Sequence, residues 1–135
     1  MVKIICGPKG SGKTKRIIDL ANEHSATAKG HLIFITDTKR YMYDLKRAIR
    51  FIDVSDYAVA GEEALSGFIK GAIAGSYDNE YVYIDGAQRI AGKSINDMAQ
   101  IFYMLEKISE MRSLKLYITC SCAEEELPDF AKKYL

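Results

Sequence analysis

The sequence has almost no excess of charge of either sign, and it contains no long apolar run. Its 19 basic and 18 acidic residues leave a formal net charge of +1 over 135 residues. A chain so close to neutral has no global field that would attract a nucleic acid or a membrane surface. No apolar run approaches the length of a transmembrane helix. The composition therefore supports neither nucleic acid nor a membrane as a partner.

Cysteine and histidine are also scarce. The three cysteines, Cys6, Cys120 and Cys122, fall on expected strands, with no Cys-x-x-Cys spacing and no histidine nearby in the sequence. We interpret them as buried small residues with reduced thiols, and a redox pair or a metal site is the alternative. Because an expected strand begins at Val2, we expect no signal peptide. These features together predict a soluble cytoplasmic protein.

What the sequence does contain is a regular alternation of apolar runs and amphipathic segments. The expected strands are 2–6, 31–36, 54–59, 80–85 and 115–120. The expected helices are approximately 13–25, 38–50, 62–76, 94–112 and 123–134. This alternation predicts an α/β fold, a three-layer α-β-α sandwich with a mostly parallel five-stranded sheet. Hydrophobic residues make up 48% of the chain, enough for the core of a single domain over residues 1–135.

Residues 7–14 fit the pattern G-x-x-x-x-G-K-[ST] without a mismatch. They read Gly7-Pro8-Lys9-Gly10-Ser11-Gly12-Lys13-Thr14. The glycines let the backbone turn tightly and bring N–H groups onto phosphate oxygens, and the helix that follows points its positive end at the same anion. Lys13 can reach the terminal phosphates, and the Thr14 hydroxyl can ligate Mg²⁺. We predict a phosphate loop here, with Lys15 as a further nucleotide-binding residue.

A second half of the site is expected at Asp85. The apolar strand Tyr81-Val82-Tyr83-Ile84 ends in this aspartate. In phosphate-loop NTPases such a strand presents its carboxylate near Mg²⁺. We therefore predict Thr14 and Asp85 as the residues that hold the metal. The alternative for Asp85 is a helix N-cap or a turn aspartate.

The phosphate loop, the strands that follow it and Asp85-Gly86-Ala87-Gln88 resemble the additional-strand P-loop ATPases. That group includes RecA-like ATPases, helicase motor lobes and the nucleotide-binding core of thymidine kinase. The chain is also similar to short stand-alone bacterial ATP-binding proteins, some of them labelled as twitching-motility ATPases. The resemblance implies a P-loop NTPase core whose strand 115–120 lies next to the first strand. It also implies a phosphate-sensing side chain at the end of that strand, which Thr119 or Ser121 would supply.

One position departs from the family pattern. Gly86 stands where these ATPases usually have a glutamate that activates the attacking water, and glycine cannot accept a proton. Two substitutes are Asp37, just after the second strand, and Gln88, because a glutamine can orient water. The alternatives are that Asp37 caps the helix beginning at Thr38 and that Gln88 bonds loop backbone.

Basic side chains outside the loop have ordinary explanations as well as functional ones. The expected helix 38–50 is basic with interleaved tyrosines, which we interpret as a solvated face rather than a surface for nucleic acid or an acidic partner. Arg89 and Arg112 are candidate arginine fingers, and surface salt bridges are the alternative.

Glycine recurs at every fourth position of the expected helix 62–76, as Gly67, Gly71 and Gly75. Glycine costs about 1 kcal/mol relative to alanine inside a helix, so such a stripe indicates a close approach of another backbone. We interpret it as tight packing on the sheet, and the alternative is a face for a partner or for self-association.

The sequence thus predicts binding of ATP with Mg²⁺, and ATP is favoured because no guanine-reading Asn-Lys-x-Asp segment stands at a suitable position. Three functions stay open. They are slow ATP hydrolysis stimulated by a partner or by oligomer formation, an ATP-dependent switch that does not hydrolyse, and phosphate transfer to a small acceptor. An unknown protein partner is compatible with the first two.

Overall fold

The computed structural model describes all 135 residues. Its strands are β1 (Val2–Gly7), β2 (His31–Thr36), β3 (Ile49–Asp53), β4 (Asn79–Ile84) and β5 (Lys115–Ser121). Its α-helices are α1 (Lys13–Ser25), α2 (Glu62–Ala74), α3 (Ala87–Ala91), α4 (Ala99–Arg112) and α5 (Asp129–Lys132). Short 3₁₀ segments are η1 (Met42–Asp44), η2 (Val54–Tyr57), η3 (Ile95–Asp97) and η4 (Glu124–Glu126).

All five strands are parallel and form one sheet in the order β1-β5-β4-β2-β3. The prediction that the first and last strands are neighbours is confirmed, because β1 pairs with β5 and Cys6 lies opposite Cys120. Because the strands are parallel, their carboxyl ends meet at one edge of the sheet. The residues that follow β1, β2, β4 and β5 therefore converge there.

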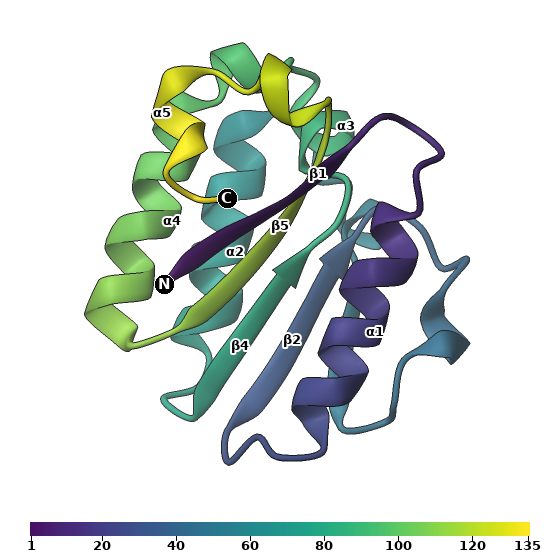
Figure 1. Ribbon diagram of the computed structural model, residues 1–135. Coiled ribbons are helices and arrows are strands. Elements are labelled where there is room, and N and C mark those ends of the chain that lie inside the picture. The colour runs from purple at the N-terminus through teal and green to yellow at the C-terminus, as the bar shows by residue number, and fades with distance from the viewer.

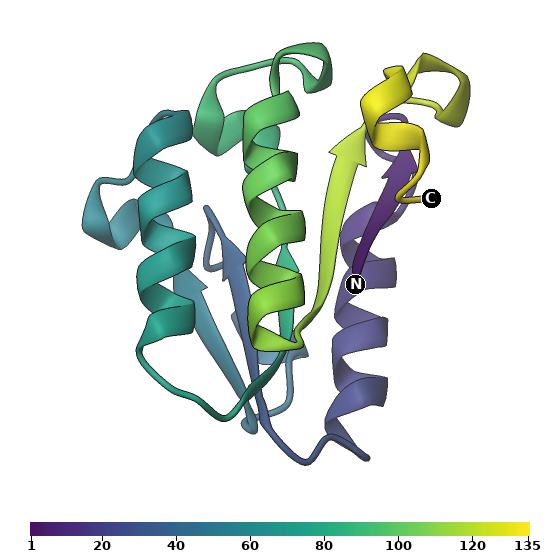
Figure 2. The ribbon, with the colours of Figure 1, turned by 90° about the vertical axis from the view of Figure 1, so that its left-hand side faces the viewer.

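Helices cover both faces of the sheet, which confirms the predicted three-layer sandwich. α1 lies alone on one face, and α2 and α4 lie on the other (Figures 1 and 2). The larger apolar cluster fills the layer beneath α2 and α4, and the smaller one lies beneath α1. None of the helices combines the length and the apolar composition that crossing a bilayer requires.

An aromatic row crosses the sheet on the face that α1 covers. Tyr117, Tyr83, Phe34 and Phe51 occupy the same register on β5, β4, β2 and β3. Their ring centroids are 5.6, 6.1 and 6.3 Å apart in that order. Cross-strand aromatic pairs of this kind stabilise a sheet and fix its register.

His24, in the last turn of α1, attaches that helix to the same surface. Its Nδ1 lies 2.8 Å from the Tyr83 hydroxyl, and its ring stacks on Tyr81 with centroids 4.4 Å apart. Burial lowers the pKa of His24, so the ring is neutral near pH 7. The far end of α1 is thereby fixed, and its N-terminus is held against the carboxyl ends of the strands.

The segment between β2 and α2 differs from the prediction. Residues 38–50 do not form a helix, and the third strand is β3 rather than 54–59. Pairing of β3 with β2 in register, Phe51 opposite Phe34, outweighs the helical spacing of the apolar residues. Residues 54–57 instead form a 3₁₀ turn, and the side chain of Asp53 accepts the N–H of Ser55 at 3.0 Å.

The two C-terminal helices are also shorter than expected. In place of a helix over 94–112, η3 precedes α4, and the side chain of Ser94 makes no capping hydrogen bond. The expected helix 123–134 is interrupted at Pro128, which has no N–H and keeps Leu127 in an extended conformation. The short helix α3 was not predicted, and it places Gln88 and Arg89 directly after β4.

The glycine stripe of α2 faces solvent, so the interpretation as tight packing on the sheet is wrong. Gly67, Gly71 and Gly75 are exposed, while Leu65 and Ile69 hold the buried face of the helix. A Cβ at Gly67 or Gly71 would meet no atom within 4 Å. These glycines therefore allow no close contact between α2 and another part of the chain.

The cysteines are unpaired and largely buried, as expected. Cys120 is almost fully buried, and burial raises the pKa of its thiol to about 12. The structure contains no group of three or more His, Cys, Asp or Glu side chains that could hold a metal ion. The interpretation as buried small residues is confirmed for Cys120 and Cys122, whereas Cys6 is only partly buried.

Candidate functional site

The loop between β1 and α1 depends on two glycines. Gly10 and Gly12 have φ angles of 83° and 88°, in the left-handed region that residues with a Cβ rarely adopt. The first hydrogen bond that enters α1 runs from Arg16 N to Gly12 O at 3.0 Å. The N–H groups of the three residues before Arg16 therefore have no helical acceptor. They are available to a bound anion.

Lys13 closes over this loop. Its Nζ donates to Pro8 O at 3.2 Å, and Ser11 N donates to the same carbonyl at 3.1 Å. Lys13 is only 8% exposed, yet it forms no ion pair with any carboxylate. A buried ammonium without a counter-ion has a strong electrostatic demand for an anion.

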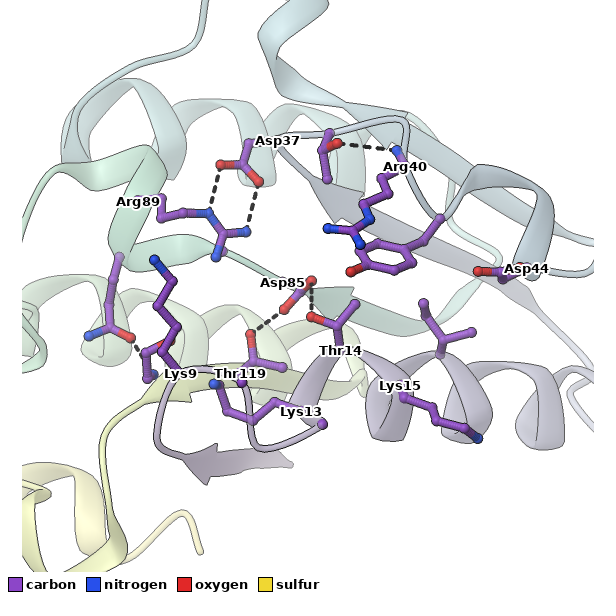
Figure 3. Close-up of a pocket in the computed structure, with 18 of the residues that line it drawn as sticks. Lys9, Lys13, Thr14, Lys15, Asp37, Arg40, Asp44, Asp85, Arg89 and Thr119 are labelled. Atoms are coloured by element: carbon purple, nitrogen blue, oxygen red, sulfur yellow. Dashed lines mark hydrogen bonds and ion pairs between the residues drawn. The ribbon is translucent and has the colours of Figure 1, made fainter.

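Asp85 lies at the meeting point of three strands. It follows β4, is 4% exposed, and its N–H donates to Ile35 O at 2.9 Å. Its Oδ2 accepts from Thr14 Oγ1 at 3.1 Å, and its Oδ1 accepts from Thr119 Oγ1 at 2.6 Å. Figure 3 shows the two threonines pointing at this carboxylate, one from α1 and one from β5. Asp85 is therefore neither a helix N-cap nor a turn residue.

The surroundings of Asp85 suit Mg²⁺. A buried carboxylate that accepts only two hydroxyl groups, with no basic side chain paired to it, has an unmet demand for positive charge. Mg²⁺ is usually held by one or two carboxylates together with substrate phosphates. The Asp85 carboxylate and the Thr14 hydroxyl fit that ligand set.

Asp37 and Arg89 form a two-fold hydrogen-bonded ion pair beside Asp85. Arg89 Nε donates to Asp37 Oδ2 at 3.0 Å, and Arg89 Nη2 donates to Asp37 Oδ1 at 2.9 Å. Both carboxylate oxygens are thus occupied, which opposes the predicted role of Asp37 as a water-activating base. Asp37 also caps no helix, because none begins at Thr38.

Gly86 lies directly beneath this pair. Its φ angle is 93°, and a Cβ there would come 2.4 Å from Arg89 Nη2 and 3.0 Å from Asp37 Oδ1. A glutamate at position 86 would therefore need a strained backbone and a displaced Arg89 side chain. In this protein the space beside Gly86 is occupied by the guanidinium of Arg89.

Gln88 holds the end of β5 in place. Its Oε1 accepts from Ser121 N at 2.7 Å. This is the backbone bond that was the alternative to a water-orienting role. Gln88 does border the cavity described below, but its carbonyl oxygen is already used.

Residues 37–44 form a roof over the loop, and we call them the roof segment. Asn22 of α1 attaches it from below. The Asn22 amide donates to Asp44 O at 2.8 Å, and its carbonyl oxygen accepts from Lys46 N at 2.9 Å. Within the roof segment, the guanidinium of Arg40 lies 5.4 Å from the ring centroid of Tyr41. Figure 3 shows Arg40 above Thr14 and Asp44 to the right of both.

A cavity of about 1060 Å³ lies between the phosphate loop and the roof segment. Only Ile18 and Tyr41 are hydrophobic among its 19 lining residues. Its basic side chains come from both walls and are Lys9, Lys13, Lys15, Arg40 and Arg89. Such a lining is suited to a charged, polyanionic ligand rather than an apolar one.

The cavity brings together most of the predicted site residues. Lys9, Gly10, Gly12, Lys13, Thr14, Lys15, Asp37, Asp85, Gln88, Thr119 and Ser121 all border it. Gly7, Pro8 and Ser11 do not border it but shape the loop. Arg112 lies elsewhere and donates to Ser76 O at 2.7 Å.

Sequence reasoning missed the roles of Tyr41 and Asp44 in the cavity. It placed Tyr41 on the expected α-helix 38–50, which does not form, and it gave Asp44 no role. The signal that could have revealed the Asp37–Arg89 pair was Gly86, since a glycine in place of a functional side chain leaves room for another group. The basic residues of that segment are also dispersed rather than gathered on one helix face, with Lys39 paired to Asp53 at 3.0 Å.

The architecture around the cavity, a five-stranded parallel α/β sandwich with a glycine-rich loop between β1 and α1, is compatible with a P-loop NTPase. Comparisons of the chain with models of known families and with curated proteins gave no match.

Proposed function

We propose that this protein binds ATP together with Mg²⁺ and hydrolyses it slowly or not at all. The observation that carries the proposal is the convergence of Thr14, Thr119 and the buried Asp85 beside a glycine-rich loop. The loop with Lys13 and Thr14, the carboxylate of Asp85 and the hydroxyl of Thr119 come from three segments that lie far apart in the sequence. Chance similarity to a short pattern does not account for their meeting in one cavity.

The phosphates would lie on the loop. Backbone N–H groups at the start of α1 would donate to phosphate oxygens, and Lys13 would exchange its bond to Pro8 O for a phosphate oxygen. Thr14 and Asp85 would hold Mg²⁺, which supplies charge neutralisation between neighbouring phosphates when bound. Thr119 orients Asp85 through its hydroxyl.

The nucleoside would lie under the roof segment. Beyond Lys15, the cavity is bordered by Ile18 of α1 and by Tyr41 and Arg40 of the roof segment. An aromatic ring with a guanidinium beside it provides a stacking surface for a nucleobase. The carboxylates of Asp19 and Asp44 are the nearby acceptors for amino or hydroxyl groups.

Slow hydrolysis follows from the surroundings of Gly86. No glutamate stands at position 86, and the two carboxylates nearest to it are engaged, Asp37 by Arg89 and Asp85 by two threonines. This observation favours the non-hydrolysing switch among the three functions. A partner that separates Asp37 from Arg89 would be needed for rapid turnover.

Isothermal titration of the purified protein with ATP, ADP and GTP, each with and without Mg²⁺, tests the proposal. We expect ATP to bind in a Mg²⁺-dependent manner, and phosphate release from the same sample to be slow. Lys13→Ala should abolish nucleotide binding, while Lys70→Ala serves as a control because that side chain is exposed on α2 and does not border the cavity. Equal ATP binding by Lys13→Ala and the wild type would exclude the assigned site.

A further inference from the structure

Arg89, a candidate arginine finger from the sequence, faces the same cavity as Lys13 and Thr14 and comes from the same chain. Its guanidinium carries five N–H groups, and the pair with Asp37 uses only two of them. The Nη1 amino group is free of protein acceptors, and so is one N–H of Nη2. Asp37 therefore orients the arginine, and three of its N–H groups stay free to donate to a ligand.

The backbone next to the guanidinium leaves room for it, because residue 86 is a glycine. Gly86 adopts a φ of 93°, and any side chain there would overlap Arg89 Nη2. Gly86 thus leaves a space that the Arg89 guanidinium fills, and Asp37 fixes the direction of the planar fork.

The pair is also accessible to a ligand. The side chains of Arg89 and Asp37 are 58% and 25% exposed, and Figure 3 shows both on the upper wall of the cavity, on the same side of Asp85. An exposed ion pair of this kind contributes little to stability by itself. Its geometry is consequently better explained by binding than by folding.

We propose that Arg89 is a specificity-determining residue that binds the terminal phosphate of a nucleoside triphosphate, and that Asp37 is the positioning residue that orients it. The inference rests on the proposed function. Guanidinium groups bind phosphate through two parallel N–H bonds, which a lysine cannot reproduce. A diphosphate lacks the group that Arg89 binds, so the arginine makes the protein prefer a triphosphate.

The test compares Kd for Mg²⁺–ADP with Kd for the Mg²⁺ complex of the β,γ-imido analogue of ATP, which is not hydrolysed. We expect Arg89→Ala to reduce the preference for the triphosphate by about tenfold or more, the effect of a lost charge-assisted contact. Arg89→Lys should restore part of it. Asp37→Asn should lower the preference less, and adding it to Arg89→Ala should change nothing further, because the two residues act as one unit.

Arg40→Ala is the matched control, since it removes an arginine from the same cavity away from Gly86. It should alter both Kd values by the same factor. If Arg89→Ala shifts only the melting temperature and keeps the ratio of the two Kd values, the inference is wrong while the proposed function stands. If the wild type binds neither nucleotide, both fail.

Discussion

The phosphate loop and the roof segment face each other across one cavity, but they are held in different ways. The loop is fixed by backbone geometry, namely two left-handed glycines and the N-terminus of α1. The roof segment has little regular structure and is held by side chains, among them Asn22 and the Asp37–Arg89 pair. The comparison indicates that the loop supplies affinity for phosphate and that the roof segment supplies selectivity.

The strongest test of this difference between the two regions is Asp85→Asn, for which we expect the largest effect. An amide can accept from only one of the two threonines without reorganisation, and it removes the charge that Mg²⁺ requires. We expect Mg²⁺–ATP to bind roughly tenfold to a hundredfold more weakly, with little change for ATP in the presence of EDTA. Titration calorimetry measures both. Asp44→Asn, an exposed carboxylate of the roof segment, is the control, and unchanged Mg²⁺ dependence in Asp85→Asn would contradict the assignment.

A smaller effect is expected from Tyr41→Ala, which distinguishes the contribution of the roof segment to binding from that of the phosphate loop. Loss of base stacking should weaken ATP binding by about fivefold to tenfold, while the affinity for inorganic tripolyphosphate, which has no base, stays the same. Competition between the two ligands measures this. Tyr43→Ala is the matched control, because that neighbouring ring is 90% exposed and does not border the cavity. Equal losses for both ligands would show that Tyr41 acts on the loop instead.

The smallest effect is expected from Asn22→Ala, which removes the two hydrogen bonds from α1 to the roof segment. We expect a loss of about 1 kcal/mol in the free energy of unfolding and faster hydrogen exchange confined to residues 38–46. Asn22→Asp keeps the acceptor for Lys46 N and loses only the donor to Asp44 O, so its effect should be intermediate. Faster exchange in the phosphate loop of Asn22→Ala would mean that the two regions are not independent.

The two regions also differ in how well the sequence predicts them. The phosphate loop is encoded locally, because strand, glycines, lysine and helix follow one another within residues 2–25. Its bounds agree with the prediction to within a residue. Asp85 could be expected as well, since it stands where an apolar strand ends, and Thr119 was implied by the resemblance to P-loop ATPases.

The roof segment could not be predicted, because long-range contacts determine its structure. Tyr41, Leu45 and Ile49 repeat at a helical spacing of four, and no proline or glycine interrupts them. What overrides this pattern is the pairing of β3 with β2, and neither the pairing nor its register is visible in a single sequence. The Asp37–Arg89 bond spans 52 positions and was hidden for the same reason.

A free, buried thiol in the sheet can report on local separation of the strands. Cys6 and Cys120 face each other on β1 and β5, one position before the phosphate loop begins to turn. Cys6 is partly exposed, whereas Cys120 is almost fully buried, and burial raises the pKa of the Cys120 thiol, so it does not react readily with an alkylating reagent while the strands are paired. The rate at which Cys120 is alkylated therefore measures how often the strands around it separate, and no probe has to be introduced to observe it.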